Sequence, residues 1–210
     1  MKQKDYTEAL TLGFLTKWYD SIVNFLGFGQ RYYAKAAGHI QPKDQDRILD
    51  IGTGTANLAI VIKRKYPKVK IIGVDPDKKI LEIAKRKIKK EVLDIELVNA
   101  PAQKLPFPSE SFDFVVSSLT IHHIPKMFKR ESFLEMKRVL KKNGTILIVD
   151  FGIPKNLLAN VISFMLSLIE DVGPNRKGLI PPTLNELGFK DVQEIESKFG
   201  LISFYKARKY

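Results

Sequence analysis

Short apolar runs recur along the middle of the chain, and stretches with helical spacing separate them. Runs of five to seven residues that are rich in Ile, Leu, Val and Phe are typical of buried strands. Five such runs predict strands at 47–51, 70–75, 94–99, 112–118 and 145–151. The helical spacing predicts helices at 55–66, 77–90, 130–141 and 155–171. Strands and helices that alternate in this way predict a parallel sheet covered on both faces.

The two ends of the chain depart from this alternation. Residues 191–198 and 201–209 read as two strands joined by a short turn, which predicts an antiparallel hairpin. Before the first strand, large apolar and aromatic residues recur at helical spacing. We therefore expect one domain over residues 1–210, with a helical part at 1–40 and a core at 41–210.

Composition narrows the class of protein. A chain of 210 residues with 44% hydrophobic residues suits a single globular core. No cysteine is present, which excludes disulfides and cysteine nucleophiles and fits a reducing cytoplasm. The three histidines lack metal-site spacing, so we expect no metal. Met1 leads into polar residues unlike a signal peptide, and the longest uncharged apolar run, 156–169, is too short to span a bilayer. We expect a cytoplasmic protein.

The net charge of +12 suggests an anionic partner. Nucleic acid and anionic lipid both fit that charge. Many of the basic residues, however, fall on the predicted helices at 55–66 and 77–90 and in the loops beside them. Helices that flank a sheet keep such residues in water, so a solvated face is the favoured interpretation and an anionic partner the alternative.

The segment ILDIGTGTA (48–56) places a glycine-rich turn between the first strand and the first helix. Such a turn lets a ligand lie against backbone N–H groups. Asp50 stands just before the turn, separated from it by Ile51, and its carboxylate disfavours a pyrophosphate but suits a cationic ammonium group. The third glycine of the dinucleotide pattern is replaced by Asn57. These features argue against NAD and favour S-adenosylmethionine.

Asp75 ends the second strand, 21 residues after Gly54. A carboxylate at this distance can accept hydrogen bonds from both hydroxyls of a bound ribose. The alternative is that Asp75 caps the following helix, although Asp77 is equally placed for that role. Ile80, one turn into the helix, is placed to pack on an adenine or in the core.

With these residues in view, the chain resembles the class I S-adenosylmethionine-dependent methyltransferases. It is most similar to the ubiquinone/menaquinone-biosynthesis branch (methyltransferase type 11) and related small-molecule and lipid enzymes. The matching segments are ILDIGTGTA, GVDPD (73–77), LPFPSESFDFVVSS (105–118), RVLKKNGTILIVDF (138–151) and ELGFKDVQEIE (186–196). The resemblance implies a doubly wound, Rossmann-like α/β fold, mostly parallel, with the C-terminal hairpin and an N-terminal helical lid.

The resemblance also implies roles for individual residues. Asp50 and the backbone of the glycine turn would hold the methionine part of the cofactor, Asp75 the ribose, and the Ala102-Gln103 loop the adenine. Pro101 stands where the family often has an acidic residue that accepts from the adenine amino group. The implied cofactor-binding residues are Tyr19, Asp50, Gly52, Thr53, Gly54, Asp75, Pro76, Ile80, Ala102, Gln103 and Ser117.

Two adjacent histidines, His122 and His123, follow the fourth strand at the edge of the sheet where ligands bind. A histidine there could take a proton from an acceptor hydroxyl or amine. One alternative is that these histidines only pack in the loop. Another is that the reaction needs no base, because alignment of the reactants is enough to promote it.

The uncharged segment 156–169 suggests the class of acceptor. We expect it, around Phe164 and Met165, to close an apolar acceptor pocket together with the N-terminal helix around Trp18 and Tyr19. Contact with a membrane, contact with a second subunit and plain core packing stay open as alternatives. The sequence thus predicts a methyltransferase for a small-molecule or lipid-like acceptor; an RNA methyltransferase and a non-catalytic cofactor-binding module are the competing hypotheses.

Overall fold

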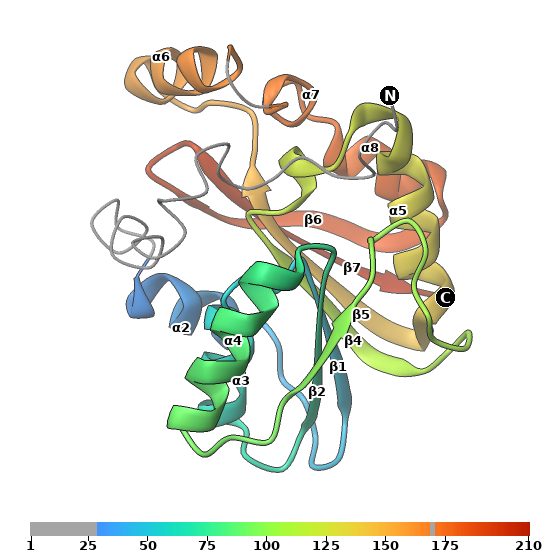
Figure 1. Ribbon diagram of the computed structural model, residues 1–210. Coiled ribbons are helices and arrows are strands. Elements are labelled where there is room, and N and C mark those ends of the chain that lie inside the picture. The colour runs from blue at the N-terminus through green and yellow to red at the C-terminus, as the bar shows by residue number, and fades with distance from the viewer. Residues whose placement is uncertain (1–28, 169–170) are drawn as a thin grey trace, which may run out of the picture.

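The computed structural model, which describes residues 29–168 and 171–210, joins the strands into one mixed sheet (Figure 1). The strand order is β3-β2-β1-β4-β5-β7-β6. The first five strands are parallel to one another, and β7 pairs antiparallel with both β5 and β6. The strands are β1 (Arg47–Ile51), β2 (Lys70–Asp75), β3 (Glu96–Asn99), β4 (Phe112–Ser118), β5 (Leu140–Phe151), β6 (Phe189–Lys198) and β7 (Ile202–Lys209). The predicted α/β class, with a C-terminal antiparallel hairpin, is confirmed.

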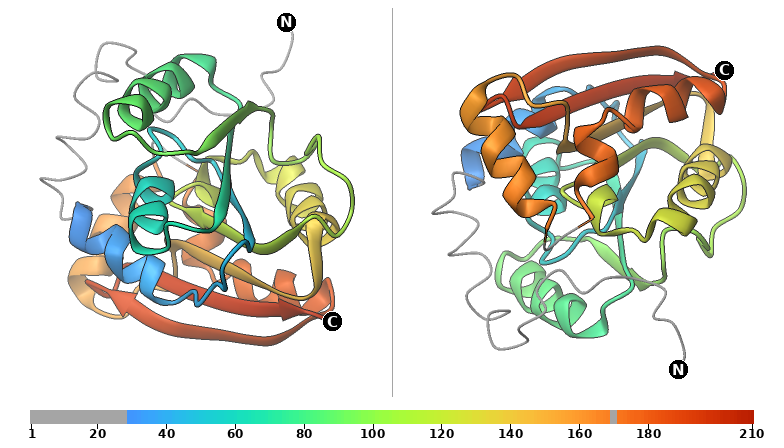
Figure 2. Two further views of the ribbon diagram at one scale, coloured as in Figure 1. Left: turned by 90° about the horizontal axis from the view of Figure 1, so that it is seen from below. Right: turned by 90° about the horizontal axis from the view of Figure 1, so that it is seen from above.

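Helices cover both faces of this sheet (Figure 2). Buried side chains of α2, α3 and α4 join one apolar cluster, and those of α5 and α8 join a second. The helical elements are α2 (Gln30–Gly38), α3 (Asn57–Lys65), α4 (Lys78–Lys90), η2 (Ile121–His123), α5 (Lys126–Val139), α6 (Leu157–Leu166), α7 (Gly173–Arg176) and α8 (Ile180–Glu186).

The central strand β1 shows why the sheet is buried on both faces. Ile48 belongs to one cluster, whereas its neighbour Leu49 and, two residues on, Ile51 belong to the other. Successive side chains of a strand point to opposite faces of the sheet, and helices cover both faces. All three side chains are therefore fully buried. Full burial of an aliphatic side chain contributes roughly 1.5–3 kcal/mol, so a near-continuous apolar strand stabilises both layers at once.

The strand order reverses between β1 and β4. From β1 the chain runs outward through β2 to β3, and it then returns to the other side of β1 to form β4 and β5. At such a switch point the connections after the two central strands leave toward opposite faces, and a crevice opens at the carboxyl ends of the strands. The fold therefore places a ligand site next to the glycine turn that follows β1.

Some boundaries differ from those that the sequence pattern predicts. The helix α5 ends at Val139, because Leu140 is extended and pairs with Phe112 of β4. Between this pair and the next, Phe114 with Thr145, the register shifts around a left-handed residue, Asn143. Elsewhere β3 and α6 are shorter than predicted. The division into a lid and a core stays a prediction, since much of the segment 1–40 lies outside the described residues.

Candidate cofactor-binding site

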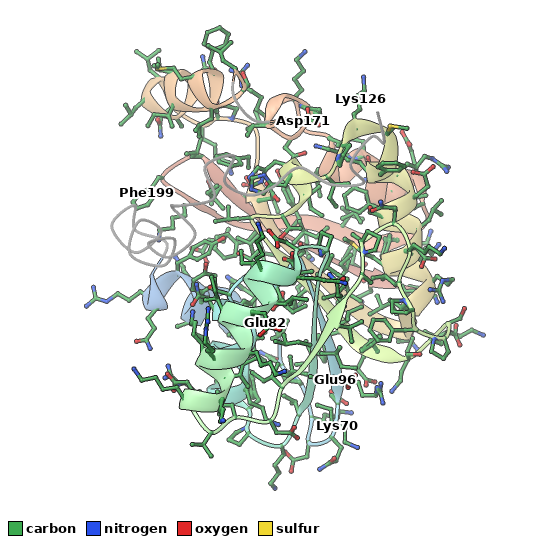
Figure 3. All side chains as sticks on the ribbon, in the orientation of Figure 1. Lys70, Glu82, Glu96, Lys126, Asp171 and Phe199 are labelled. Carbon is green, nitrogen blue, oxygen red and sulfur yellow. The ribbon has the colours of Figure 1, made fainter. Side chains whose placement is uncertain are left out.

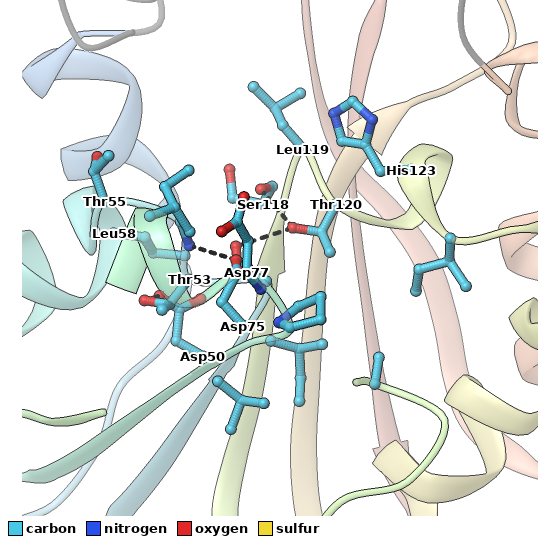
Figure 4. Close-up of a pocket in the computed structure, with 18 of the residues that line it drawn as sticks. Asp50, Thr53, Thr55, Leu58, Asp75, Asp77, Ser118, Leu119, Thr120 and His123 are labelled. Carbon is cyan, nitrogen blue, oxygen red and sulfur yellow. Dashed lines mark hydrogen bonds between the residues drawn. The ribbon is translucent and has the colours of Figure 1, made fainter. Parts of the chain in front are cut away.

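A cleft opens at the carboxyl ends of β1, β2 and β4 (Figure 4). Its empty space, including the part open to solvent, is about 1000 Å³. Four segments form the wall: the turn after β1, the turn after β2, the loop 100–103 and the segment 118–124 after β4.

The glycine turn has a backbone that side chains would disturb. Gly52 has φ +66° and Gly54 has φ +54°, both in the left-handed region. A Cβ atom on Gly52 would lie 2.1 Å from the nearest side-chain carbon of Thr120. Thr120 holds this close position because its hydroxyl donates to the carbonyl of Gly52, at 3.1 Å. The turn after β1 and the segment after β4 are thereby clamped together across the cleft.

Two buried carboxylates lie beneath this turn. Asp50 is fully buried in β1, and its Oδ2 accepts a hydrogen bond of 2.8 Å from the hydroxyl of Thr53. Burial raises the pKa of Asp50 to about 7 and that of Asp75 to about 6. The negative charge of Asp75 adds to the rise at Asp50. A cationic ligand group would relieve the cost of ionising both carboxyls, which suits an ammonium or a sulfonium.

Asp75 ties two turns together. Its Oδ2 accepts from the backbone N–H of Gly54 at 3.0 Å, and its Oδ1 accepts from that of Asp77 at 2.9 Å. A carboxylate has about four acceptor positions, so two remain for hydroxyl groups of a ligand. The capping role that the sequence leaves open for Asp75 is filled by Asp77, whose side chain accepts from the N–H of Lys79.

The structure brings most of the sequence-predicted cofactor residues to the cleft. Ser117 is an exception: it does not line the cleft, and its hydroxyl donates to the carbonyl of Ile51. The resemblance implies that Ser117 acts through its backbone carbonyl, and that role stays a prediction. The next residue, Ser118, lines the cleft instead. Tyr19 lies outside the described residues. The predicted residues that line the cleft are Asp50, Gly52, Thr53, Gly54, Asp75, Pro76, Ile80, Ala102 and Gln103.

The two histidines are placed differently. His123, at the end of η2, lines the cleft, whereas His122 is buried behind it. The ring centroids of the two lie 4.0 Å apart. The Nδ1 of His122 donates to the carboxylate of Asp150 at 2.8 Å. The side chain of His122, one of the two predicted catalytic histidines, does not line the cleft. His123 does line it and is therefore the candidate for proton transfer.

Asp150, which the sequence reading missed, holds this region in place. Its carboxylate accepts from the backbone N–H groups of Thr120 (3.1 Å) and Ile121 (2.7 Å), and from the amide of Asn175 (3.1 Å). Burial alone would raise its pKa, but the charge and hydrogen bond of His122 together with the N–H of Phe151 hold it below the usual value. An ionised Asp150 thus fixes the start of η2, which carries His123. Tyr33 of α2, also missed, lines the cleft.

The apolar segment predicted to close an acceptor pocket lies elsewhere. Phe164 and Met165 of α6 are 54% and 62% exposed, and neither lines the cleft. Their expected partners, Trp18 and Tyr19, lie outside the described residues. Across the described residues, no group of three or more His, Asp or Glu side chains is arranged to hold a metal.

Comparisons with known proteins agree with this geometry. A family model described as a methyltransferase domain matches residues 48–144. The demethylmenaquinone methyltransferase of Thermotoga maritima is 31% identical over 152 residues, covering 70% of this chain and 64% of that relative. The chain thus spans slightly less than two thirds of the length of this curated relative. A ubiquinone/menaquinone biosynthesis C-methyltransferase of Geobacter sulfurreducens is 27% identical over 91% of this chain and 84% of its own length.

A solved structure supports the fold. The S-adenosylmethionine-dependent methyltransferase from Aquifex aeolicus superposes with a TM-score of 0.70 at 20% identity, over 96% of this chain and 100% of that one. At this identity the likeness concerns the fold, and the sequence matches carry the family. The comparisons therefore support a class I S-adenosylmethionine-dependent methyltransferase of the ubiquinone/menaquinone-biosynthesis-like branch, with S-adenosylmethionine as its cofactor.

Proposed function

We propose that the protein transfers a methyl group from S-adenosylmethionine to a ring carbon of a small, lipid-like quinol. The use of S-adenosylmethionine as the methyl donor is supported by the pair of buried carboxylates, Asp50 and Asp75, beside the glycine turn. The quinol acceptor is supported by the names of the relatives, which are a demethylmenaquinone methyltransferase and a ubiquinone/menaquinone biosynthesis C-methyltransferase.

The cofactor fits the cleft in three parts. The carboxylate of Asp50 and the exposed backbone of the turn suit the methionine part, with its ammonium group. The free acceptor positions of Asp75 suit the ribose hydroxyls. Ile80, Ala102 and Pro101 offer apolar surface to the adenine ring, and Gln103 offers a polar side chain at its edge. When bound, the cofactor supplies an electrophilic methyl group on a sulfonium.

His123 is the residue that we place on the acceptor side. When the ring carbon forms its bond to the methyl group, the carbon–sulfur electrons stay on sulfur, and the acceptor must lose one proton. The imidazole of His123 lines the cleft and receives that proton. His122 and Asp150 act as positioning residues, because they fix η2 and do not reach the cleft.

Two measurements test the proposal in order. Calorimetry should give binding of S-adenosylmethionine and S-adenosylhomocysteine, and no comparable binding of NAD; binding of NAD alone would refute the cofactor. The purified protein, labelled S-adenosylmethionine and demethylmenaquinol should then yield labelled menaquinol. Binding without turnover on quinol, small-molecule, lipid, protein or RNA fractions would favour a non-catalytic module.

The net charge of +12 motivates a second candidate, an RNA methyltransferase. Binding through phosphate contacts weakens steeply with salt. Label that enters the RNA fraction, together with RNA binding that falls as salt increases, would favour this candidate over the quinol enzyme.

A further inference from the structure

Exposed apolar side chains gather on one helix of the protein. Among the described residues, thirteen large apolar side chains are exposed, and eight of them lie between Ile153 and Leu168. Leu157 is 79% exposed, Leu158 70% and Met165 62%. A soluble monomer rarely presents so contiguous an apolar surface, and such patches mark contact with another molecule or a membrane.

Neither the core nor the cleft accounts for this helix. Of the ten residues in α6, only Ala159 and Ser163 are buried. Arg176 of α7 holds that side through hydrogen bonds to Ser163 and Asn160. The helix thus rests on the protein through small residues and Leu166, which packs against the core, and most of its other large side chains face away. Closure of an acceptor pocket with Trp18 and Tyr19 stays a prediction, because those residues lie outside the described part of the chain. Among the described residues, the exposure of the helix favours contact with a membrane or with a second subunit.

The position of α6 connects this surface with the site. The helix follows the carboxyl end of β5, at the same edge of the sheet as the cleft (Figure 1). Figure 3 places Phe199, at the tip of the β6–β7 hairpin, and Lys126, at the start of α5, toward this edge. Phe199 is 64% exposed, and its carbonyl accepts from Asn156, which caps α6. Lys70 and Glu96 lie at the opposite end (Figure 3).

The charge around the helix favours an anionic surface. The stretch 153–168 contains one charged residue, Lys155, and no carboxylate. Arg176 lies 5.8 Å above the ring of Phe164, and its neighbour Lys177 is exposed. Asp171, which precedes α7, is paired with Lys129, and Lys155 itself is paired with Glu194 of β6. Apolar side chains beside cations such as Arg176 and Lys177 are the combination that binds anionic lipid.

We propose that α6 docks the protein on the surface of an anionic lipid bilayer. The apolar side chains of Leu158, Ile162 and Met165 enter the acyl boundary, and Arg176 and Lys177 lie at the headgroups. Ten residues form a helix of about 15 Å, half of the bilayer core of about 30 Å, so the helix lies on the membrane. No helix in the described part of the chain is long and apolar enough to cross it.

Docking of this kind would turn the cleft mouth toward the bilayer, where a lipid-like acceptor resides. That consequence rests on the proposed function, whereas membrane binding itself does not. Vesicle binding without methylation of a quinol would support the docking surface and refute the proposed quinol acceptor. Methylation of an acceptor without any binding to vesicles would support the methyltransferase activity and refute the docking surface.

The test is co-sedimentation of the full chain with vesicles. One set contains phosphatidylcholine alone, and the other contains about one third phosphatidylglycerol in addition. We expect binding to the anionic vesicles that is at least ~5-fold stronger than to the neutral ones, because anionic lipid adds electrostatic attraction. Leu158→Glu combined with Met165→Glu should lower anionic-vesicle binding at least ~10-fold.

Val92→Glu is the matched control. Val92 is 90% exposed but follows α4 at the amino-terminal edge of the sheet, so this variant should bind vesicles like the parent. Cofactor affinity and the melting temperature check that each variant is folded. If the double variant melts early, Leu157→Glu alone serves, since Leu157 is the most exposed large apolar side chain of the helix.

Three results would overturn the proposal. The first is no sedimentation of the parent with either vesicle. The second is equal loss in the α6 and Val92 variants, which would make the effect one of charge alone. The third is a parent that forms dimers which Leu158→Glu and Met165→Glu dissolve, without vesicle binding, because α6 would then face a second copy.

Discussion

Asp75 combines a structural and a ligand-binding position in one side chain. It clamps the N–H groups of Gly54 and Asp77, and it keeps acceptor positions toward the cleft. We predict that Asp75→Asn weakens S-adenosylmethionine binding by roughly 1–3 kcal/mol, because a polar ligand group loses its charged partner. Calorimetry with S-adenosylmethionine measures this directly.

Asp113→Asn is the control for that prediction. Asp113 also accepts from a backbone N–H, that of Arg47, but it lies at the amino end of β4, away from the cleft. Its substitution should leave cofactor affinity unchanged. If Asp75→Asn lowers the melting temperature and leaves the affinity intact, Asp75 only clamps the turn.

The two histidines should separate in kinetics. His123→Gln removes the imidazole that lines the cleft, and we predict a fall in kcat of roughly 10²-fold or more, the usual contribution of a general base. The affinity for S-adenosylmethionine should change less than ~3-fold. Single-turnover rates with quinol check this. An unchanged kcat would mean that alignment of the reactants suffices and that no base is needed.

At the scale of elements, one carboxylate joins β5, η2 and α7. Asp150 is fully buried and accepts from two N–H groups at the start of η2, from His122 and from Asn175. We predict that Asp150→Asn lowers the free energy of unfolding by roughly 3–5 kcal/mol, because the variant leaves buried donors facing an amide. Urea denaturation measures the loss.

Ser203→Ala gives that experiment its control, because Ser203 is buried in β7 near the same strand but carries no charge. It should cost far less stability. Equal losses in the two variants would show that Asp150 acts by filling space and not through its charge.

The sequence pattern predicted the parallel strands well, and the reason is physical. The strands at 47–51, 70–75 and 112–118 have the predicted boundaries, because each is a nearly continuous apolar run buried on both faces. The boundary between α5 and β5 could not be read locally. Leu140 suits a helix by composition, but its pairing with Phe112, 28 positions earlier, makes it extended.

At the scale of the whole molecule, some parts of the site could likewise be predicted from the local sequence and others could not. The glycine turn and Asp75 are visible in the sequence because each sits at a predicted strand end. The bonds of Asp150 to residues 25–30 positions away, and the approach of Thr120 to Gly52, depend on how distant strands meet. The exposure of α6 was equally hidden, because an apolar helix reads alike in the core and on the surface.

The raised pKa values of Asp50 and Asp75 make the stability of the whole molecule depend on pH. Both carboxyls have an ordinary pKa of 3.8 when unfolded, against about 7 and about 6 in the native protein. Between pH 4 and 7 the native state therefore holds protons that the unfolded chain has released. Stability should fall as pH rises through this window and level off above it. The lowered pKa of Asp150 acts in the opposite direction, since its contribution is lost only as the pH falls below about 4.

Binding of the cationic cofactor should reverse this cost. A cation favours the ionised carboxylates, so binding should release protons between pH 5 and 7, and affinity should rise with pH across that range. Calorimetry in buffers of different ionisation enthalpy counts the protons, and urea denaturation at each pH gives the stability. Asp50→Asn should flatten most of the stability slope and weaken the pH dependence of binding, whereas Asp113→Asn should change neither. Proton uptake on binding, or a parent whose stability is level from pH 4.5 to 7.5, would contradict the assignment of these two buried carboxyls to the cationic ligand.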